Sequence, residues 1–371
     1  MKVLIISSNT KSLINFRGSL ILKIKSLGHE VYTLSPEIDS TSKEKLEKIG
    51  VISYEYNLDR TGFNLLNDLN TFFDLVRYIK KIKPDLVFTY TVKPVIYGSL
   101  AAKYCKVPKI FSMITGLGSG FSDDLKISTK VIKYIIILLY KISCSRINGL
   151  IFQNDDDRLY FINKNIINEN LTYHVNGSGV DLNLYKFKSP QIFPIRFMFI
   201  GRLLVEKGLL DFISASKIIK IQYPEVIFDI LGPFDINKKN LSQNDFMKLI
   251  NEAEVNYLGE TSDVRSFIKS TSVYVMPSYY KEGVPRTTLE CLAMGRPVIT
   301  TNMPGCKETV VNNLNGFLIP IKNPFAIASA MEKFICNKNL ITEMGIQSRN
   351  IAVNKFDVEI INKKMVEILN L

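Results

Sequence analysis

Short runs of apolar residues, rich in valine and isoleucine, recur along the chain and are separated by longer amphipathic stretches. In the first half these runs cover residues 3–7, 30–34, 86–89, 109–113 and 150–153. The pattern starts again in the second half, at residues 197–201, 226–231, 255–258, 273–276, 298–301 and 317–320. Short buried strands that alternate with helices are typical of a parallel sheet covered by helices on both faces. We therefore predict an α/β protein with two Rossmann-like domains in tandem.

The boundary between the two domains is expected in residues 187–194, which contain two prolines and show no apolar periodicity. This places the first domain at residues 1–188 and the second at residues 189–352. The remaining segment, residues 353–371, is predicted to form a helix that could cross back to the first domain. Two facing Rossmann-like domains form a cleft, and ligands bind such sheets at the carboxyl ends of their strands.

The charge of the chain is unevenly distributed. Its 371 residues carry a net charge of +12, of which residues 1–190 contribute +9, from 26 basic and 17 acidic residues. A basic balance favours an anionic partner: nucleic acid, a phospholipid surface or a phosphate-bearing small molecule. With 46% hydrophobic and 22% charged residues the composition is that of a globular protein, which excludes a disordered chain.

Cysteine and hydropathy patterns exclude further classes. The five cysteines are scattered and form no CxxC pair, so the sequence indicates neither a zinc site nor a disulfide framework. The most apolar stretch, residues 131–139, is interrupted by Lys133 and is too short to span a membrane.

The strongest candidate for chemistry is the segment 280–297, YKEGVPRTTLECLAMGRP, between two expected strands. A helix is expected to begin near Arg286, and its free amides would form a phosphate site at the carboxyl edge of the sheet. Glu282 and Glu290 flank this helix start, and carboxylates readily accept hydrogen bonds from sugar hydroxyls. From composition alone, a surface loop with a helix-terminal charge is the favoured interpretation.

A second candidate follows the first strand of the second domain, in residues 199–208, FIGRLLVEKG. Arg202 and Lys207 follow Gly201, which places two cations where a diphosphate would lie in a Rossmann-like domain. The alternative is that both are solvated surface cations.

Taken together, these motifs resemble the retaining glycosyltransferases of family four, which have the GT-B fold. The carrying residues are the GxPxxxLExxAxGxPVI pattern around Glu282 and Glu290, the GR and Lys-Gly pair at 201–208, and residues 305–308. In the first half, residues 15–17, 89–94, 116–119 and 153–156 resemble a bacterial subgroup that extends undecaprenyl-diphosphate-linked sugars for capsule, O-antigen or N-glycan assembly. An α-1,3-N-acetylgalactosaminyltransferase is the best-known type of that subgroup.

The resemblance implies roles for individual residues. Arg202 and Lys207 would hold the donor diphosphate, Glu290 the ribose hydroxyls, and Glu282 the transferred sugar; Glu282, Arg202 and Lys207 are the catalytic candidates. The implied donor site contains Gly201, Arg202, Lys207, Glu282, Gly283, Val284, Pro285, Arg286, Thr287 and Glu290. The donor would be UDP-GalNAc, UDP-GlcNAc or UDP-Gal, with no other cofactor and no metal.

The same resemblance implies an acceptor site in the first domain, for a lipid-linked saccharide. Its candidates are Asn15, Arg17, Lys93, Gly116, Gly118 and Ser119, with Arg17 expected in the first loop, close to the start of the amphipathic stretch 16–27. Many relatives have a histidine after the strand 86–89; this chain lacks it, and Lys93 or Tyr90 would occupy that side.

A basic amphipathic helix is expected at residues 126–141. Lys126, Lys130, Lys133 and Lys141 share one side of it and apolar residues the other. Such a helix can lie on an anionic membrane. Together with the lipid-diphosphate acceptor that the resemblance implies, it leads us to expect a cytoplasmic protein at the inner face of the plasma membrane. A buried Rossmann helix with solvated lysines would show the same pattern.

Three alternatives remain open at this point. Residues 155–157 contain a DxD motif, which can hold a divalent ion, although acids at a helix start also serve as caps. A nucleotide-sugar epimerase would share the two-domain architecture. A nucleic-acid-binding protein would explain the charge, but the chain shows no recognised binding module.

Overall fold

The computed structural model describes residues 1–59, 62, 64–118, 121, 127–234 and 241–371; for residues 65 and 127–130 it describes the backbone. These residues form two compact units. The first contains Met1–Ser178 together with Glu359–Leu371, and the second contains Gly179–Val358. Each unit is built on one parallel sheet.

The sheet of the first unit has the strand order β3-β2-β1-β4-β5-β6-β7. Its strands are β1 (Lys2–Ile6), β2 (Glu30–Ser35), β3 (Ile52–Glu55), β4 (Leu86–Tyr90), β5 (Lys109–Ile114), β6 (Gly149–Phe152) and β7 (Thr172–His174). All pairings are parallel, and β1, at the point where the order reverses, pairs with both β2 and β4. Reversal beside the first strand is the hallmark of the Rossmann topology.

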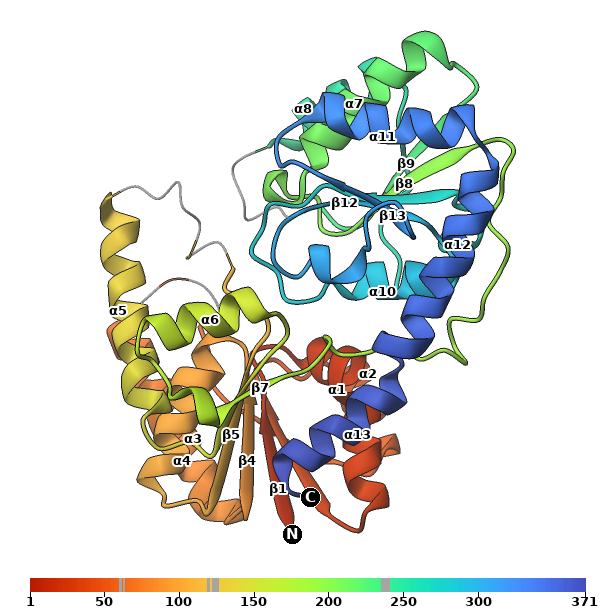
Figure 1. The fold of residues 1–371 in the computed structure, drawn as a ribbon. Helices are drawn as coiled ribbons and strands as arrows, with labels where there is room; N and C mark the ends of the chain where they lie inside the picture. The colour runs from red at the N-terminus through yellow and green to blue at the C-terminus, as the bar shows by residue number, and fades with distance from the viewer. Residues whose placement is uncertain (60–61, 63, 119–120, 122–126, 235–240) are drawn as a thin grey trace. The chain divides into compact units, whose positions relative to one another are not determined.

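Helices cover both faces of this sheet (Figure 1). They are α1 (Thr10–Ser26), α2 (Ser40–Lys48), α3 (Leu65–Ile82), the π-helical turn η1 (Pro94–Gly98), α4 (Ser99–Tyr104), α5 (Ile127–Cys144), α6 (Asp155–Asn163), the 3-10 turn η3 (Glu169–Leu171) and α13 (Val358–Leu369). One hydrophobic core joins the sheet to α3, α4, α5 and α6, and a second joins the opposite face to α1 and α13. Side-chain caps begin several of these helices: Asn9 accepts from the Ser12 amide and Asn154 from the Asp157 amide.

The second unit repeats the same strand order, β10-β9-β8-β11-β12-β13. Its strands are β8 (Arg196–Ile200), β9 (Ile227–Leu231), β10 (Asn256–Tyr257), β11 (Val273–Met276), β12 (Val298–Thr301) and β13 (Gly316–Ile319). Its helices are η4 (Val205–Lys207), α7 (Leu209–Gln222), α8 (Gln243–Glu252), α9 (Arg265–Ser270), α10 (Arg286–Ala293), η5 (Lys307–Thr309), α11 (Pro324–Cys336), α12 (Asn339–Ile351) and η6 (Ala352–Phe356). The core on one face contains α7, α8 and α11, and that on the other contains α9 and α10.

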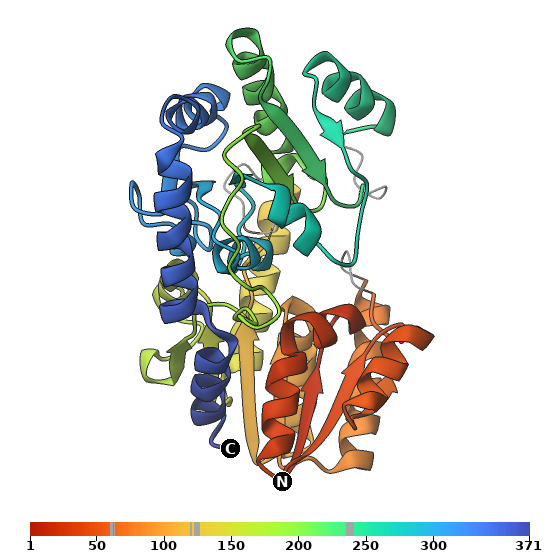
Figure 2. The same ribbon diagram turned by 90° about the vertical axis from the view of Figure 1, so that its right-hand side faces the viewer.

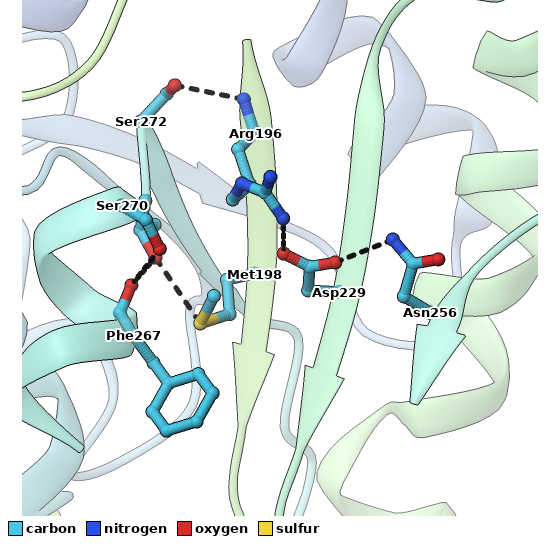
Figure 3. Close-up of polar contacts among 8 residues, drawn as sticks. Arg196, Met198, Asp229, Asn256, Phe267, Ser270 and Ser272 are labelled. Atoms are coloured by element: carbon cyan, nitrogen blue, oxygen red, sulfur yellow. Dashed lines mark hydrogen bonds and ion pairs between the residues drawn. The ribbon is translucent and has the colours of Figure 1, made fainter. Parts of the chain in front are cut away.

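A polar network around one buried carboxylate ties three neighbouring strands of the second unit together (Figure 3). The Asp229 carboxylate on β9 is fully buried; one of its oxygens pairs with the Arg196 guanidinium on β8, and the other accepts from Asn256 Nδ2 on β10 at 2.9 Å. The Arg196 amide donates to Ser272 Oγ at 2.9 Å. A charge is tolerated inside a sheet only when it is paired in this way.

The strands expected from the apolar runs are all present, and the structure adds β3 and β7. Three boundaries differ from expectation. The second unit ends at Val358 rather than at residue 352, because Ala352 and Phe356 belong to one of its cores. The division between units falls after Ser178 rather than after residue 188, because Val180 and Tyr185 belong to a core of the second unit. Helix α1 begins at Thr10 rather than at residue 16, because Asn9 caps it.

The C-terminal helix α13 belongs to the first unit. Ile361, Met365, Ile368 and Leu369 are buried in the core that also contains β1 and α1, and Figures 1 and 2 show the helix, in dark blue, beside the first sheet. Among the helices that the structure describes, none has both the length and the apolar character needed to cross a membrane.

Candidate active site

Two loops of the second unit meet at the carboxyl edge of its sheet. After β8 the chain passes through Gly201 and η4, and the Lys207 side chain lies over Gly201: a Cβ added at that glycine would be 3.6 Å from Lys207 Cδ. After β11 the chain enters the loop 277–285. The amides of Tyr279 and Tyr280 both donate to the Glu206 carbonyl at 2.9 Å, which joins the two loops.

An ion pair between Lys207 and Glu282 lies at this junction. The Nζ–Oε1 distance is 2.9 Å, and each side chain keeps only 13% of its surface exposed. Ser278 Oγ donates to the same carboxylate oxygen at 3.3 Å. The structure therefore brings together two of the three residues predicted to be catalytic; the third, Arg202, is exposed in the loop after β8.

Glycines set the backbone spacing around this pair. Gly208 has a φ of +77°, and a Cβ there would lie 2.2 Å from the Pro277 carbonyl oxygen. Gly305, after β12, has a φ of +82°, and a Cβ there would lie 1.9 Å from the Gly283 carbonyl oxygen. Only glycine allows backbones to approach this closely, so the loops after β8, β11 and β12 pack into one cluster.

Helix α10 points its N-terminus at the same edge. Gly283, Val284 and Pro285 are buried, and Arg286 and Thr287 are partly exposed. Pro285 occupies the N-cap position, and among the described residues no side chain accepts a capping hydrogen bond there. The first turn of the helix contains no acidic residue. A helix start of this kind supplies amide donors and a positive dipole end to an anion.

Glu290 lies further along α10 and has its own set of partners. Its Oε1 accepts from Arg286 Nε at 2.8 Å and from Tyr185 Oη at 2.9 Å, and the residue is 6% exposed. Burial raises the pKa of this carboxyl, while Arg286 and the Tyr185 hydroxyl act in the opposite direction. The sequence analysis missed Tyr185, which lies 105 residues away along the chain.

The acceptor residues predicted in the first unit differ in their exposure to solvent. Asn15 and Arg17 lie within helix α1, not in a loop before it, because the helix starts at Thr10. Asn15 is exposed, but Arg17 is 2% exposed, with its guanidinium over the Tyr90 ring and Nη2 2.8 Å from Met113 Sδ. Burial lowers the pKa of Arg17, and its Nε has no hydrogen-bond partner among the described residues.

Lys93 follows β4 and is 8% exposed, with Nζ 2.7 Å from Asp68 Oδ1 on α3. Gly116 and Gly118 follow β5 and both have positive φ, 104° and 70°. Ser119 lies outside the described residues.

The predicted membrane lysines are only partly described. Lys126 and the side chain of Lys130 lie outside the described residues. Lys133 is turned toward the rings of Phe121 and Tyr160, at 5.6 and 5.8 Å, whereas Lys141 is exposed. The apolar side of α5 is the exposed one: Val131, Tyr134, Ile135, Leu138 and Ile142 keep 43–71% of their surface.

The DxD residues form the first turn of α6. Asn154 caps this helix, and its Nδ2 donates to Asp157 Oδ2 at 3.0 Å. In the part of the chain that the structure describes, no three His, Cys, Asp or Glu side chains are grouped as a metal site would require.

Two family models match the chain. Residues 2–154 match the model described as "Glycosyl transferase 4-like", and residues 187–351 match "Glycosyl transferases group 1". Together the two matches cover most of the chain, and each covers the sheet of one unit almost completely.

Curated relatives are similar over most of their length. An N,N'-diacetylbacillosaminyl-diphospho-undecaprenol alpha-1,3-N-acetylgalactosaminyltransferase from Campylobacter jejuni is 26% identical, over 99% of this chain and 98% of the relative. A UDP-Gal:alpha-D-GlcNAc-diphosphoundecaprenol alpha-1,3-galactosyltransferase from Escherichia coli is also 26% identical, over 80% and 78%. The capsular polysaccharide biosynthesis glycosyltransferase CapM from Staphylococcus aureus is 26% identical, over 90% and 88%.

Solved structures share the fold of the whole chain. HepE from Anabaena, in complex with UDP, has a TM-score of 0.80 at 19% identity and is matched over 100% of both chains. Sucrose-phosphate synthase from Thermosynechococcus elongatus has a TM-score of 0.81 at 15% identity, over 100% and 98%. The predicted GT-B fold is confirmed, and the chain is a glycosyltransferase with a glycosyl transferase 4-like first half and a group 1 second half.

Proposed function

We propose that this glycosyltransferase moves a hexosyl or N-acetylhexosaminyl unit, with retention of anomeric configuration, from a UDP-sugar to a saccharide on a lipid diphosphate. The assembly of a surface polysaccharide or glycan is the expected context. The names of the relatives from C. jejuni and E. coli support the lipid-diphosphate acceptor, and the UDP complex of HepE supports the donor base. The observation that carries the proposal is the Lys207–Glu282 pair at the sheet edge of the second unit.

In this proposal the second unit binds the donor through residues 201–208 and 282–290. The departing diphosphate gains negative charge in the transition state, and Lys207, Arg202 and the α10 amides stabilise that charge. Glu282 holds Lys207 in place before the donor arrives and then contacts the transferred sugar. Glu290, oriented by Tyr185 and Arg286, accepts hydrogen bonds from the ribose hydroxyls.

The acceptor proton leaves to an oxygen of the departing diphosphate on the same face of the sugar. No protein base and no metal ion are needed for that step, because cationic side chains neutralise the diphosphate. In the first unit, Asn15, Lys93 and the residues around Gly116 and Gly118 are the proposed acceptor contacts. Arg17 is proposed to support Tyr90 from below, since its guanidinium is already buried against that ring.

The protein is also proposed to act at the inner face of the plasma membrane as a peripheral enzyme. The exposed apolar side of α5 supports this proposal, with Lys141 on the same helix facing solvent. This differs from the initial expectation in that apolar side chains, rather than a lysine stripe, make the contact.

The test measures transfer from UDP-GalNAc, UDP-GlcNAc and UDP-Gal to a radiolabelled lipid-linked saccharide. For the best donor, Lys207→Ala is expected to lower kcat about 100- to 1,000-fold, the range for losing one preorganised charge-stabilising group. Lys217→Ala is the matched control, because that lysine is exposed on α7 and pairs with Glu252 at 3.4 Å, away from the loops of the site. Near-normal turnover of Lys207→Ala would overturn the donor site, and an inverted anomeric product would overturn retention.

A further inference from the structure

A groove with almost entirely apolar walls lies in the first unit, between α3, the η1–α4 segment and α5. Its volume is about 730 Å³. Its walls are Leu69 and Phe72 from α3, Tyr97, Leu100 and Tyr104 from η1–α4, and Ile132, Ile135 and Leu139 from α5. Asp68 and Lys103 are its two charged lining residues, and none of the residues proposed to bind the donor takes part.

The two ends of the groove differ in character. At one end Asp68 forms an ion pair with Lys93, which lies three residues beyond the end of β4, so this end lies at the carboxyl edge of the sheet. At the other end Tyr104 closes α4, with Lys80 Nζ 5.5 Å from its ring centre and Lys103 donating to Ser145 at the end of α5. The groove therefore runs from the edge where ligands bind such sheets to an opening flanked by lysines.

The helices that form the groove also carry large apolar side chains that are exposed. Leu66 and Phe73 on α3 are 73% and 64% exposed, and Tyr134 and Leu138 on α5 are 71% and 49% exposed. Soluble proteins rarely leave so many neighbouring apolar side chains in water unless the surface binds something.

Charge narrows the choice of occupant. Among the lining residues that the structure describes, Asp68 is the only carboxylate and is neutralised by Lys93, so the charge that these residues leave at the groove is that of Lys103 and the nearby Lys80. This positive charge complements anionic headgroups, and it would repel a basic amphipathic helix as an alternative occupant. A hydrocarbon chain has no hydrogen-bonding groups to satisfy and needs only apolar walls, which this groove supplies.

We infer that the groove binds the hydrocarbon chain of the lipid diphosphate acceptor, an inference that rests on the proposed function. The chain enters from the membrane at the Tyr104 end, where Lys80 and Lys103 face anionic headgroups. It leads toward the Asp68–Lys93 end, which places the diphosphate at the carboxyl edge of the sheet. Isoprenoid chains, with their methyl branches, suit the mixed aromatic and aliphatic walls.

The test exploits the absence of tryptophan from this sequence. In the full chain, Leu69→Trp places a single tryptophan in the groove, and its emission is excited selectively over that of tyrosine. The probe is a C15 isoprenoid diphosphate with a brominated chain, used below its aggregation concentration. We expect saturable quenching that the unbrominated C15 diphosphate reverses. Ile221→Trp, at a position 85% exposed on α7, is the reference fluorophore and is expected to show no saturable quenching.

A matched pair of substitutions separates the groove from the surface around it. Ile135→Glu and Ile132→Glu introduce a charge at lining positions that are 43% and 38% exposed, so folding should tolerate both. In the Leu69→Trp background each is expected to weaken probe binding at least ten-fold. Tyr134→Glu, next to Ile135 but outside the groove lining, is expected to leave the affinity unchanged.

Transfer assays distinguish the proposed lipid groove from the proposed function. They use the variants without the Leu69→Trp substitution. We expect Ile135→Glu to raise KM for a long-chain acceptor about ten-fold, without changing kcat or KM for the donor. Absent quenching in Leu69→Trp, or equal binding by Ile135→Glu and Tyr134→Glu, would overturn the groove while leaving transfer intact. Quenching without any transfer by the unmodified chain would instead overturn the proposed function.

Discussion

The buried Asp229 network offers a direct test of how the second unit is held together. Replacing Asp229 with alanine leaves the Arg196 guanidinium and Asn256 Nδ2 without the carboxylate that both contact. Breaking a buried ion pair from one side costs about 3–5 kcal/mol in the free energy of unfolding. Arg196 keeps 24% of its side chain exposed and so recovers some hydration, which places the expected loss at the lower end of that range.

The loss can be converted into a melting temperature. The second unit spans Gly179–Val358, and for a domain of this size each kcal/mol shifts Tm by about 2–4 °C. A fall of about 6–12 °C is therefore expected in the transition of the second unit, measured by scanning calorimetry. Hydrogen exchange of the β8 and β9 amides assigns the transition to that unit.

A double substitution tests whether the loss of stability comes from leaving one charge of the pair without its partner. Arg196→Met combined with Asp229→Leu removes both charges, and it should recover most of the loss because apolar residues of similar volume replace the pair. Glu252→Ala, which breaks the exposed Lys217 pair, should cost less than about 1 kcal/mol and serves as control. A loss below about 1 kcal/mol for Asp229→Ala would refute the reasoning, as would a double variant no more stable than the single one.

Four further outcomes are expected. Gly305→Ala should lower both Tm, measured by scanning calorimetry, and kcat, because its Cβ would lie 1.9 Å from the Gly283 carbonyl oxygen; an unchanged Tm would contradict the close packing of these loops. Tyr185→Phe should raise the Glu290 pKa further, since the hydroxyl lowers it. A carboxyl whose pKa is higher in the folded than in the unfolded state makes the folded protein less stable as pH rises above 4.5. The difference in Tm between Tyr185→Phe and the unmodified chain should therefore widen from pH 4.5 to pH 7. A difference that does not change with pH would argue against this role of the Tyr185 hydroxyl. Transfer should persist in EDTA, whereas complete loss that Mn²⁺ or Mg²⁺ restores would implicate residues 155–157. Leu138→Glu should weaken binding to anionic vesicles at least ten-fold in a sedimentation assay at all salt concentrations, whereas Lys141→Glu should matter only at low salt; equal binding by Leu138→Glu would remove the apolar side of α5 from the membrane contact.

The sequence predicted the two sheets well because most strands are buried on both faces and therefore read as continuous apolar runs. Strands β3 and β7 were not predicted, because they lie at the edges of the first sheet. Their residues are only partly buried and include serine, threonine, glutamate and histidine. The start of α1 escaped because its first turns are polar and its cap is a single side chain, Asn9.

Within the candidate site, the loops at 201–208 and 282–290 were predictable from motif resemblance, but their partners were not. Tyr185 reaches Glu290 only because residues after Ser178 fold with the second unit, which no local pattern reveals. Helix α5 shows a related limit. Its periodicity correctly grouped the apolar positions on one side, but periodicity alone does not say which side of a helix faces solvent.

The return of α13 to the first unit has a consequence for the order in which the protein can fold during synthesis. The sheet of the first unit is complete by His174, yet its core also needs Ile361, Met365 and Leu369 from the far end of the chain. At about 5–20 residues per second, a ribosome needs roughly 10–40 s to make the intervening residues. During that interval the nascent first unit exposes the apolar surface that α13 later covers, and the second unit can fold before the first is finished. A fragment ending at Ser178 reproduces this incomplete first unit. We expect it to bind chaperones until a peptide of residues 358–371 is supplied.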